Sequence, residues 1–270
     1  MVLLALFGAV MGQGVVWYTG QFYAQSFLET KCKLDFEQSR TIILWAILFA
    51  TPFFIFWGWL SDKIGRKWIM MVGMTLAIVT YRPIFNIFLS YSDPKNWVTD
   101  KNENFSFLSK GPNQETKDLN DSTRITTGRY PIPGGGMATT TVTYKKDPST
   151  QQFNVASVEF SNRKLPKDIY WTFIALVFAL ILYVTMVYGP IAAFLVEMFP
   201  TKIRYTSMSL PYHIGNGVFG GLVPFIGLLL TTTFPTDPLV GLWYPIGVGG
   251  LCLVIGVLYL RNKIDRNIND

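Results

Sequence analysis

Six long hydrophobic stretches dominate the pattern of the chain, and short polar clusters or prolines separate most of them. A bilayer core of about 30 Å requires about 20 apolar residues in a helix, and each stretch reaches that length. The polar–apolar alternation of barrel strands is absent from them, so we expect helices. The predicted transmembrane helices are Val2–Leu28, Thr41–Leu60, Trp68–Leu89, Tyr170–Phe199, Tyr205–Leu230 and Leu239–Leu260.

Residues 91–168 form one long polar segment between the third and fourth predicted helices. Within it, MATTTVTYKK (137–146) and FNVASVEF (153–160) alternate and are rich in β-branched residues, which predicts a β-hairpin with a long turn. Residues 100–123 have the composition of an irregular surface loop. We therefore predict an all-α membrane protein with a β-hairpin insertion outside the cytoplasm. The predicted domains are 1–90 (helices one to three), 91–168 (the insertion) and 169–270 (helices four to six and the tail).

The composition excludes several classes of protein. Charged residues make up 15% of the 270 residues, and the mean hydropathy is +0.31, whereas soluble domains carry about 25% charged residues. Half of the charged residues fall within 91–168. The net charge of +6 lies in short loops rather than on one basic face. A soluble enzyme, a disordered chain and a nucleic-acid-binding domain are thereby excluded. Cys32 and Cys252 are too few for a disulfide framework or a metal site.

Lysine and arginine in the short loops predict the orientation, because cytoplasmic loops carry more of them. One set of connections holds eight of these residues and the opposite set holds three. The eight are Lys63, Arg66, Lys67, Lys202, Arg204, Arg261, Lys263 and Arg266, against Lys31, Lys33 and Arg40. The C-terminus is therefore expected in the cytoplasm and the segment 91–168 outside.

The first predicted helix begins without a preceding cytoplasmic segment. A signal peptide is one alternative, but the stretch lacks a charged start and no charge interrupts it through Leu28. We therefore expect the chain to be a fragment whose earlier part is missing.

The most specific motif lies at the end of the second predicted helix. GWLSDKIGRK (58–67) places Asp62 four residues before Arg66, with Gly58 and Gly65 permitting tight backbone turns. We expect these charges to form a latch between neighbouring helices, or to set Asp62 against a helix N-terminus. A purely structural or membrane-insertion role for them is the alternative.

The order of this motif resembles the inter-helix signature of the major facilitator superfamily, whose secondary transporters contain two six-helix halves. A second stretch places Glu197 seven residues before Arg204, and it is similar to the acid–arginine pair at the cytoplasmic end of the family's tenth helix. Segments 12–28 and 204–221 are similar to the metabolite:proton symporter branch. That branch includes transporters of α-ketoglutarate, shikimate, citrate and proline/betaine.

The resemblance implies the C-terminal half of such a transporter; residues 91–168 have no counterpart in most members. In the family, the signature loop locks helices together in one access state and releases them in the other. The implied gating residues are Gly58, Asp62, Gly65, Arg66, Glu197 and Arg204. The implied partners are a missing N-terminal half, a small-molecule solute, protons and the lipid bilayer.

Polar side chains on two predicted helices indicate a solute cavity. The first and fifth helices each carry four, at spacings that place them on one face. They are Gln13, Trp17, Tyr18 and Gln21 on the first helix, and Ser209, Tyr212, His213 and Asn216 on the fifth. Gln13 lies about 18 Å from the inner end at about 1.5 Å per residue, near the midplane. Hydrogen bonding between helices is the alternative role for each of these residues.

The predicted helices also contain a histidine, His213, and an arginine, Arg82. Histidine titrates near physiological pH, so His213 is a candidate proton carrier, but a hydrogen-bonded packing role is favoured. Arg82 is expected to extend to the headgroups, and attraction of an anionic substrate is the alternative. No Asp or Glu lies deep in any predicted helix. We therefore expect the proton-carrying acid of a symporter to lie in the missing half.

The favoured function is a secondary active transporter of a small polar metabolite in the bacterial inner membrane. The solute is an organic acid, an amino acid or a betaine, with proton coupling and alternating access. A membrane-anchored receptor or binding module that acts through residues 91–168 is the alternative. A membrane enzyme is not favoured, because paired intramembrane acids, a metal-ligand cluster and a nucleophile beside a base are absent from the pattern. We expect no cofactor, no bound metal and no nucleic-acid partner.

Overall fold

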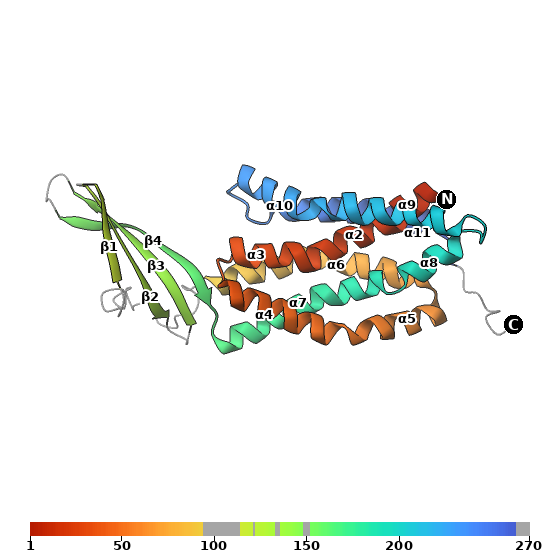
Figure 1. Ribbon diagram of the computed structural model, residues 1–270, viewed down its shortest axis with the longest axis horizontal. Helices are drawn as coiled ribbons and strands as arrows, with labels where there is room; N and C mark the ends of the chain where they lie inside the picture. Colours follow the sequence, from red (N-terminus) through yellow and green to blue (C-terminus); the bar gives the residue numbers. More distant parts are fainter. Residues whose placement is uncertain (94–113, 121, 133–135, 148–151, 263–270) are drawn as a thin grey trace. The chain divides into compact units, whose positions relative to one another are not determined.

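The computed structural model describes residues 1–93, 114–120, 122–132, 136–147 and 152–262. The chain divides into two compact units. The helical unit contains Met1–Ser26, Ile42–Asn86 and Ile174–Asp270, and the sheet unit contains Phe27–Thr41 and Ile87–Phe173. Within the helical unit, the long helices lie side by side (Figure 1). The predicted domain boundaries at residues 90 and 168 stay a prediction.

Among the described residues, six helices are long and apolar enough to cross a membrane. They are Val2–Thr30, Phe36–Ile64, Arg66–Ser92, Lys167–Met198, Arg204–Thr233 and Val240–Tyr259. Each contains one of the predicted stretches almost entirely, so the predicted number and order of helices are confirmed. Most of the observed helices extend beyond the predicted limits, because polar residues such as Glu37 and Ser61 continue a helix past its apolar part.

Several of the six helices change geometry along their length. The first comprises α1 (Val2–Ala5), the π-helical turn η1 (Leu6–Val10), α2 (Met11–Tyr18), the π-helical turn η2 (Thr19–Tyr23) and α3 (Ala24–Thr30). The fifth comprises α9 (Arg204–Ile214), the π-helical turn η5 (Gly215–Gly220) and α10 (Leu222–Thr233). π-Helical turns are rare and occur frequently at functional sites. Two of these three turns directly flank α2, which holds most of the predicted cavity residues of the first helix.

Prolines divide the second and fourth helices, because a proline has no N–H to continue the hydrogen-bond ladder. The second comprises α4 (Phe36–Ala50) and α5 (Pro52–Ile64), and the fourth comprises α7 (Lys167–Tyr188) and α8 (Ile191–Met198), which begins after Pro190. The third is α6 (Arg66–Ser92), and the sixth comprises a 3₁₀ turn, η6 (Val240–Leu242), and α11 (Trp243–Tyr259).

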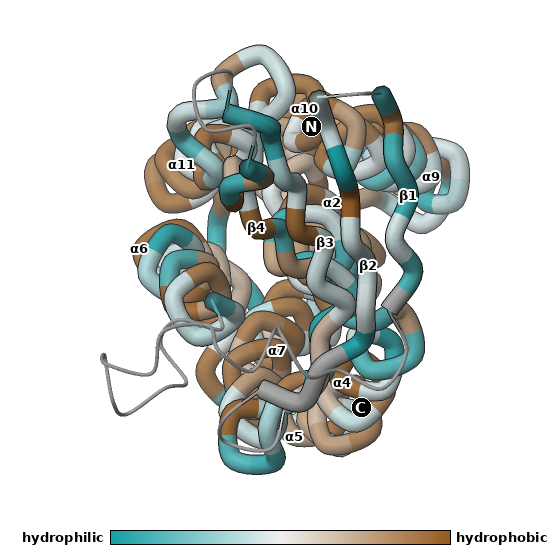
Figure 2. Tube along the Cα trace, turned by 90° about the vertical axis from the view of Figure 1, so that its left-hand side faces the viewer, coloured by the Kyte–Doolittle hydropathy of each residue, from teal (hydrophilic) through white to brown (hydrophobic). Residues whose placement is uncertain are grey.

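The helical unit has both an interior and an apolar outer surface. Glycines allow the first and fifth helices to touch through their backbones: a Cβ on Gly14 would lie 2.5 Å from the carbonyl oxygen of Gly215. Leu44 on α4 and Ile55 on α5 are instead 64% and 79% exposed. Figure 2 shows hydrophobic colouring along much of α5, α7 and α11. Such a surface suits contact with lipid, as expected for a membrane protein.

The sheet unit contains a four-stranded antiparallel sheet in the order β1-β2-β3-β4. The strands are β1 (Gln114–Asn120), β2 (Thr123–Ile132), β3 (Gly136–Lys146) and β4 (Phe153–Lys164). The β3–β4 pair confirms the predicted hairpin. The sheet also contains β1 and β2, which were not predicted, so the prediction of an irregular loop over Gln114–Asn120 is wrong. The strand QETKDLN is polar on both faces, so its sequence lacks the alternation that identifies a strand. Residues 100–113 lie outside the described residues.

The end of β4 is fastened to other parts of the sheet unit by hydrogen bonds. The backbone of Arg163 pairs with Lys33 and Asp35, and its guanidinium donates to the carbonyl of Ser92 at 2.7 Å. The side-chain amide of Gln38 pairs with both backbone groups of Leu165. The sheet is therefore attached to the loop after α3, to the start of α4 and to the end of α6.

Candidate functional site

The predicted gating residues lie at a tight turn of the helical unit. α5 ends at Ile64 and α6 begins at Arg66, so Gly65 alone connects them. The φ angle of Gly65 is +96°, in the region that glycine adopts without strain. The side chain of Asn262 occupies the position of a Cβ on Gly65. Glycine is therefore required here for both backbone conformation and space.

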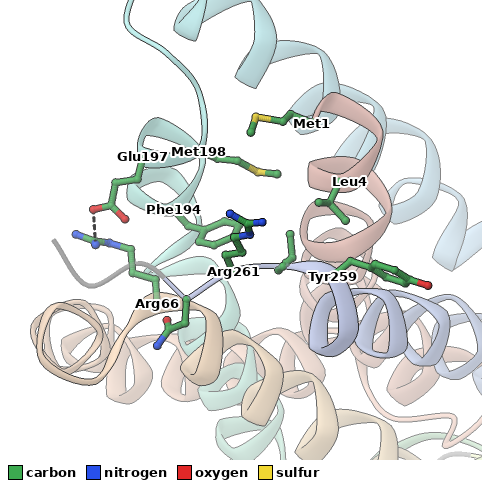
Figure 3. Close-up of a pocket in the computed structure, with 10 residues that line it drawn as sticks. Met1, Leu4, Arg66, Phe194, Glu197, Met198, Tyr259 and Arg261 are labelled. Carbon is green, nitrogen blue, oxygen red and sulfur yellow. Dashed lines mark ion pairs between the residues drawn. The ribbon is translucent and has the colours of Figure 1, made fainter.

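Arg66 connects two acidic residues from different helices. Its guanidinium donates to the Asp62 carboxylate at 2.8 Å, and its other terminal nitrogen forms an ion pair with Glu197 of α8 (Figure 3). The side chain of Arg66 is only 11% exposed, compared with 59% for Asp62 and 24% for Glu197. Ionic hydrogen bonds with a buried partner are stronger and less screened by salt than surface pairs. The structure thus brings Asp62, Arg66 and Glu197 together, which we name the ionic cluster.

Two predicted gating residues lie outside this cluster. Arg204 donates from Nε to the carbonyl of Phe199 at 3.1 Å, and the ion pair of Glu197 is with Arg66. Gly58 lies inside α5, where a Cβ would meet no atom within 4 Å. Neither a turn nor close packing therefore requires glycine at position 58.

Lys67 also lies in this region, and from the sequence it was counted only among the basic residues that predict the orientation. It is 6% exposed, and its ammonium group donates to the carbonyls of Val257 and Leu260 at 2.8 and 2.7 Å. These carbonyls belong to the C-terminal end of α11, where they have no partner within the helix. Lys67 therefore caps α11 from α6. Its position in the GRK motif was the available signal, but the sequence did not show its acceptor.

A cavity of about 370 Å³ lies beside the ionic cluster. Arg66 and Glu197 line it together with apolar side chains such as Leu4, Phe194 and Met198, and with Arg261 beyond α11 (Figure 3). Met1, the α5–α6 turn, the end of α8 and the end of α11 therefore lie at one end of the helical unit, which we name the signature end. Lys263 and Arg266 of the orientation prediction lie outside the described residues.

Gln13 and Asn216, two predicted cavity residues, form a hydrogen bond with each other. The amide nitrogen of Asn216 donates to the Gln13 side-chain oxygen at 3.1 Å and to the Tyr212 carbonyl at 3.0 Å. Gln13 is fully buried and Asn216 is 8% exposed. In this structure the pair joins the first and fifth helices, which is the alternative role stated for these residues. The Gln13 nitrogen and the Asn216 oxygen are buried and have no hydrogen-bond partner among the described residues.

The remaining aromatic cavity residues form a half-buried cluster with a tyrosine from a third helix. The ring of Trp17 lies 5.5 Å from that of Tyr18 and 5.2 Å from that of Tyr188 in α7. The hydroxyls of Tyr188 and Tyr212 are 2.6 Å apart. We name Trp17, Tyr18, Tyr188 and Tyr212 the aromatic face. Tyr188 was not among the predicted cavity residues, although a tyrosine before a Gly-Pro break in an apolar helix was an available signal.

His213 and Gln21 lie near this cluster in sequence, and only His213 is more exposed than its members. His213 is exposed, and its Nδ1 lies 2.8 Å from the Ser209 carbonyl and 3.2 Å from the Ser209 hydroxyl. A carbonyl only accepts, so Nδ1 carries the proton and Nε2 is directed elsewhere. Gln21 is half-buried.

Arg82 forms an ion pair within the protein, which differs from both of its predicted roles, extension to the headgroups and attraction of an anionic substrate. Its guanidinium lies 3.6 Å from the carboxylate of Asp237, in the loop before η6, and 4.9 Å from the ring centre of Trp243. The Asp237 carboxylate also accepts from the backbone N–H of Leu239. Arg82 therefore holds α6 to the connection between α10 and α11.

Metal ligands are not clustered in the part of the chain that the structure describes, where no group of three or more His, Cys, Asp or Glu side chains is placed to hold an ion. Cys252 is fully buried and unpaired, as expected for a packing residue.

Comparison with known proteins gives two partial similarities. The chain is 35% identical to the inner membrane metabolite transport protein YhjE of Escherichia coli, over 26% of this chain and 15% of that protein. It is 41% identical to a protein of Haemophilus influenzae whose name assigns it to metabolite transport, over 22% of this chain and 16% of that protein. The matched stretch thus spans about a sixth of each relative. No family model matches the chain, and no solved structure matches it.

Proposed function

We propose that this chain works as one six-helix half of a major facilitator transporter that moves a small polar metabolite by alternating access. The contact of buried Arg66 with both Asp62 and Glu197 carries the proposal. This contact joins the signature motif of α5 and α6 to α8 at the signature end. The partial similarity to two metabolite transport proteins supports the same function.

The ionic cluster has the features of a two-state latch. Arg66 is held by two carboxylates on different helices, so a movement of α8 away from α6 separates one pair while Asp62 retains the other. Since Asp62 is mostly exposed, its retained pair with Arg66 contributes little, and the less exposed Arg66–Glu197 pair distinguishes the closed arrangement from the open one. Alternating access requires an element of this kind, with two discrete arrangements.

We further propose that the signature end faces the cytoplasm of a bacterial inner membrane. Exposed Lys63, Lys202 and Arg261 lie at that end, Lys63 in the last turn of α5 and the other two outside the helices, in agreement with the positive-inside rule. Residues 91–168 then lie outside. Coupling to protons requires a titratable group along the solute path. We assign this group to the partner half, because no Asp or Glu lies deep in any of the six predicted helices.

The decisive experiment compares uptake of metabolites in cells that express the full-length protein or its variants. Asp62→Asn, Arg66→Ala and Glu197→Gln are expected to abolish most of the uptake while leaving the amount of membrane-inserted protein unchanged. Asp168→Asn is the matched control, because that exposed carboxylate lies in the first turn of α7, in the other unit. Normal uptake in all three cluster variants would contradict the latch.

A receptor or binding module is the second candidate, and the four-stranded sheet favours it. The sheet is larger than the predicted hairpin, and its edge strand β1 is exposed. Replacement of residues 114–161 by a short Gly-Ser linker separates the two candidates. The transport proposal expects uptake to persist in this variant. Loss of a ligand response with no measurable uptake in either protein would favour the receptor.

A further inference from the structure

We propose that the aromatic face recognises its solute through an alkylated ammonium group. The inference rests on the proposed transport function and narrows the substrate to one chemical class. Three helices supply the face: α2 provides Trp17 and Tyr18, α7 provides Tyr188 and α9 provides Tyr212. All four side chains are half-buried, so parts of their surfaces are available to a ligand.

The aromatic face lies within the membrane-length helices, away from their ends. At about 1.5 Å per residue, Trp17 is about 22 Å from the start of its helix and Tyr212 about 12 Å from the start of α9. Hydroxyl groups at this depth are costly against hydrocarbon. The exposed side chains Ile55 and Phe56 of α5 are, by contrast, entirely apolar. The aromatic face therefore suits a polar solute path rather than a lipid-facing surface.

The charge of the surrounding helices selects the sign of the solute group. Residues 1–26, 169–196 and 205–236 contain no Asp, Glu, Lys or Arg. A solute with only negative charge would lose water against these helices without meeting a cationic side chain. A cation is attracted by the negative faces of aromatic rings, most strongly by tryptophan. A methylated ammonium is favoured because it has few hydrogen bonds to water to lose, and aromatic sites are its usual protein receptors.

The tyrosine hydroxyls add a site for an acceptor on the same solute. One proton lies between the Tyr188 and Tyr212 oxygens, which are 2.6 Å apart. The hydroxyl that accepts this hydrogen bond keeps its own proton, which is able to donate to a carboxylate. A zwitterion with a trimethylammonium group and a carboxylate satisfies both features.

The test measures calorimetric binding to the full-length protein in detergent. The probes are trimethylglycine and 3,3-dimethylbutyrate, which has nearly the same shape with carbon in place of the charged nitrogen. Trimethylglycine is expected to bind about threefold to thirtyfold more tightly than this isostere. Trp17→Leu is expected to remove the preference, and Tyr212→Phe to weaken binding while retaining it. Trp45→Leu is the matched control, because Trp45 is exposed on α4, where it stacks on Phe49.

Three results would overturn the proposal: equal binding of the two probes, an unchanged preference in a folded Trp17→Leu protein, or tighter binding of succinate than of trimethylglycine. Thermal unfolding in detergent confirms that each variant is folded.

Different results contradict the transport proposal and the ammonium-site proposal. Binding of trimethylglycine without uptake of any solute contradicts transport and leaves the ammonium site supported. Uptake of other metabolites that trimethylglycine does not inhibit contradicts the site and leaves transport supported.

Discussion

At the scale of single residues, the buried cation Lys67 supports the end of a neighbouring helix. Its ammonium group donates to two carbonyls at the end of α11. Lys67→Met leaves these carbonyls without their donor, and we expect a loss of about 1–3 kcal/mol in unfolding free energy. Lys63→Met is the control, because Lys63 is exposed and lies over the ring of Trp59. Equal midpoints of thermal unfolding in detergent for the two variants would contradict the capping role.

The buried amides of Gln13 and Asn216 offer a second test at this scale. Gln13→Leu leaves a buried Asn216 donor without one acceptor, and Asn216→Leu leaves Gln13 unpaired, so each change is expected to cost about 1–3 kcal/mol. The double variant removes both polar groups, and its cost is expected to be smaller than the sum of the two. Chemical unfolding of the four proteins measures this coupling. Additive costs would show that the hydrogen bond contributes nothing to stability.

At the residue scale, the sequence marked individual charged residues but not their distant partners. The motif selected Asp62 and Arg66, which the structure places in contact, while their gating role stays a prediction. The partner of Arg66 in α8 is 131 positions away, and the family resemblance implied a different pair, Glu197 with Arg204. The packing of the helices determines which partner a charged residue meets. That packing cannot be read from the spacing of residues along one helix. The same limit applies to Arg82, whose acceptor Asp237 lies in a distant loop.

At the scale of helices, close packing predicts different effects for two glycines of the π-helical turn η5. A Cβ on Gly215 would lie 2.7 Å from Val10 Cγ1 and 2.9 Å from the Val10 backbone, whereas a Cβ on Gly217 would meet no atom within 4 Å. Gly215→Ala is expected to destabilise the protein by about 1–3 kcal/mol through overpacking. Gly217→Ala is expected to be neutral or slightly stabilising. Thermal unfolding of the two variants measures the difference, and similar midpoints would contradict the packing of the first helix against the fifth.

In the sheet, the pairing of β1 with β2 includes a pH-dependent contact. Arg124 donates to the Asp118 carboxylate at 2.7 Å, and this hydrogen bond lowers the pKa of Asp118. A lowered folded pKa adds stability above the unfolded value of about 3.9, and that stability is lost as the pH falls through the folded value. Wild-type β1 is therefore expected to exchange amide hydrogens more slowly than Asp118→Asn at pH 7. The difference should disappear at the acid end, and a constant difference at all pH values would contradict this account.

The same sheet shows why elements were predicted unevenly. Hydrophobic runs of bilayer length identify a helix from its own residues, so each observed membrane-length helix contains most of a predicted stretch. β3 and β4 alternate and were found in the same way. β1 has no apolar face, and its structure depends on hydrogen bonds to β2. An edge strand of this kind is stabilised by its neighbour rather than by its own pattern.

At the scale of the whole molecule, the orientation in the membrane decides whether the ionic cluster is an inner or an outer latch. The proposal places the signature end in the cytoplasm and residues 91–168 outside. Two exposed lysines report on these positions: Lys63 at the end of α5 and Lys117 in β1. In intact cells, a membrane-impermeant maleimide is expected to label Lys117→Cys and not Lys63→Cys, and permeabilisation should reverse the protection of position 63.

The native cysteines do not obscure this labelling experiment. Cys32 and Cys252 are both buried, and burial raises the pKa of the Cys32 thiol to about 12. Its reactive thiolate is therefore scarce at neutral pH, and the wild-type protein serves as the unlabelled control. Labelling of Lys63→Cys in intact cells would place the signature end outside. A latch there would close the outer side of the solute path, so the direction of gating proposed for Arg66 and Glu197 would have to be reversed.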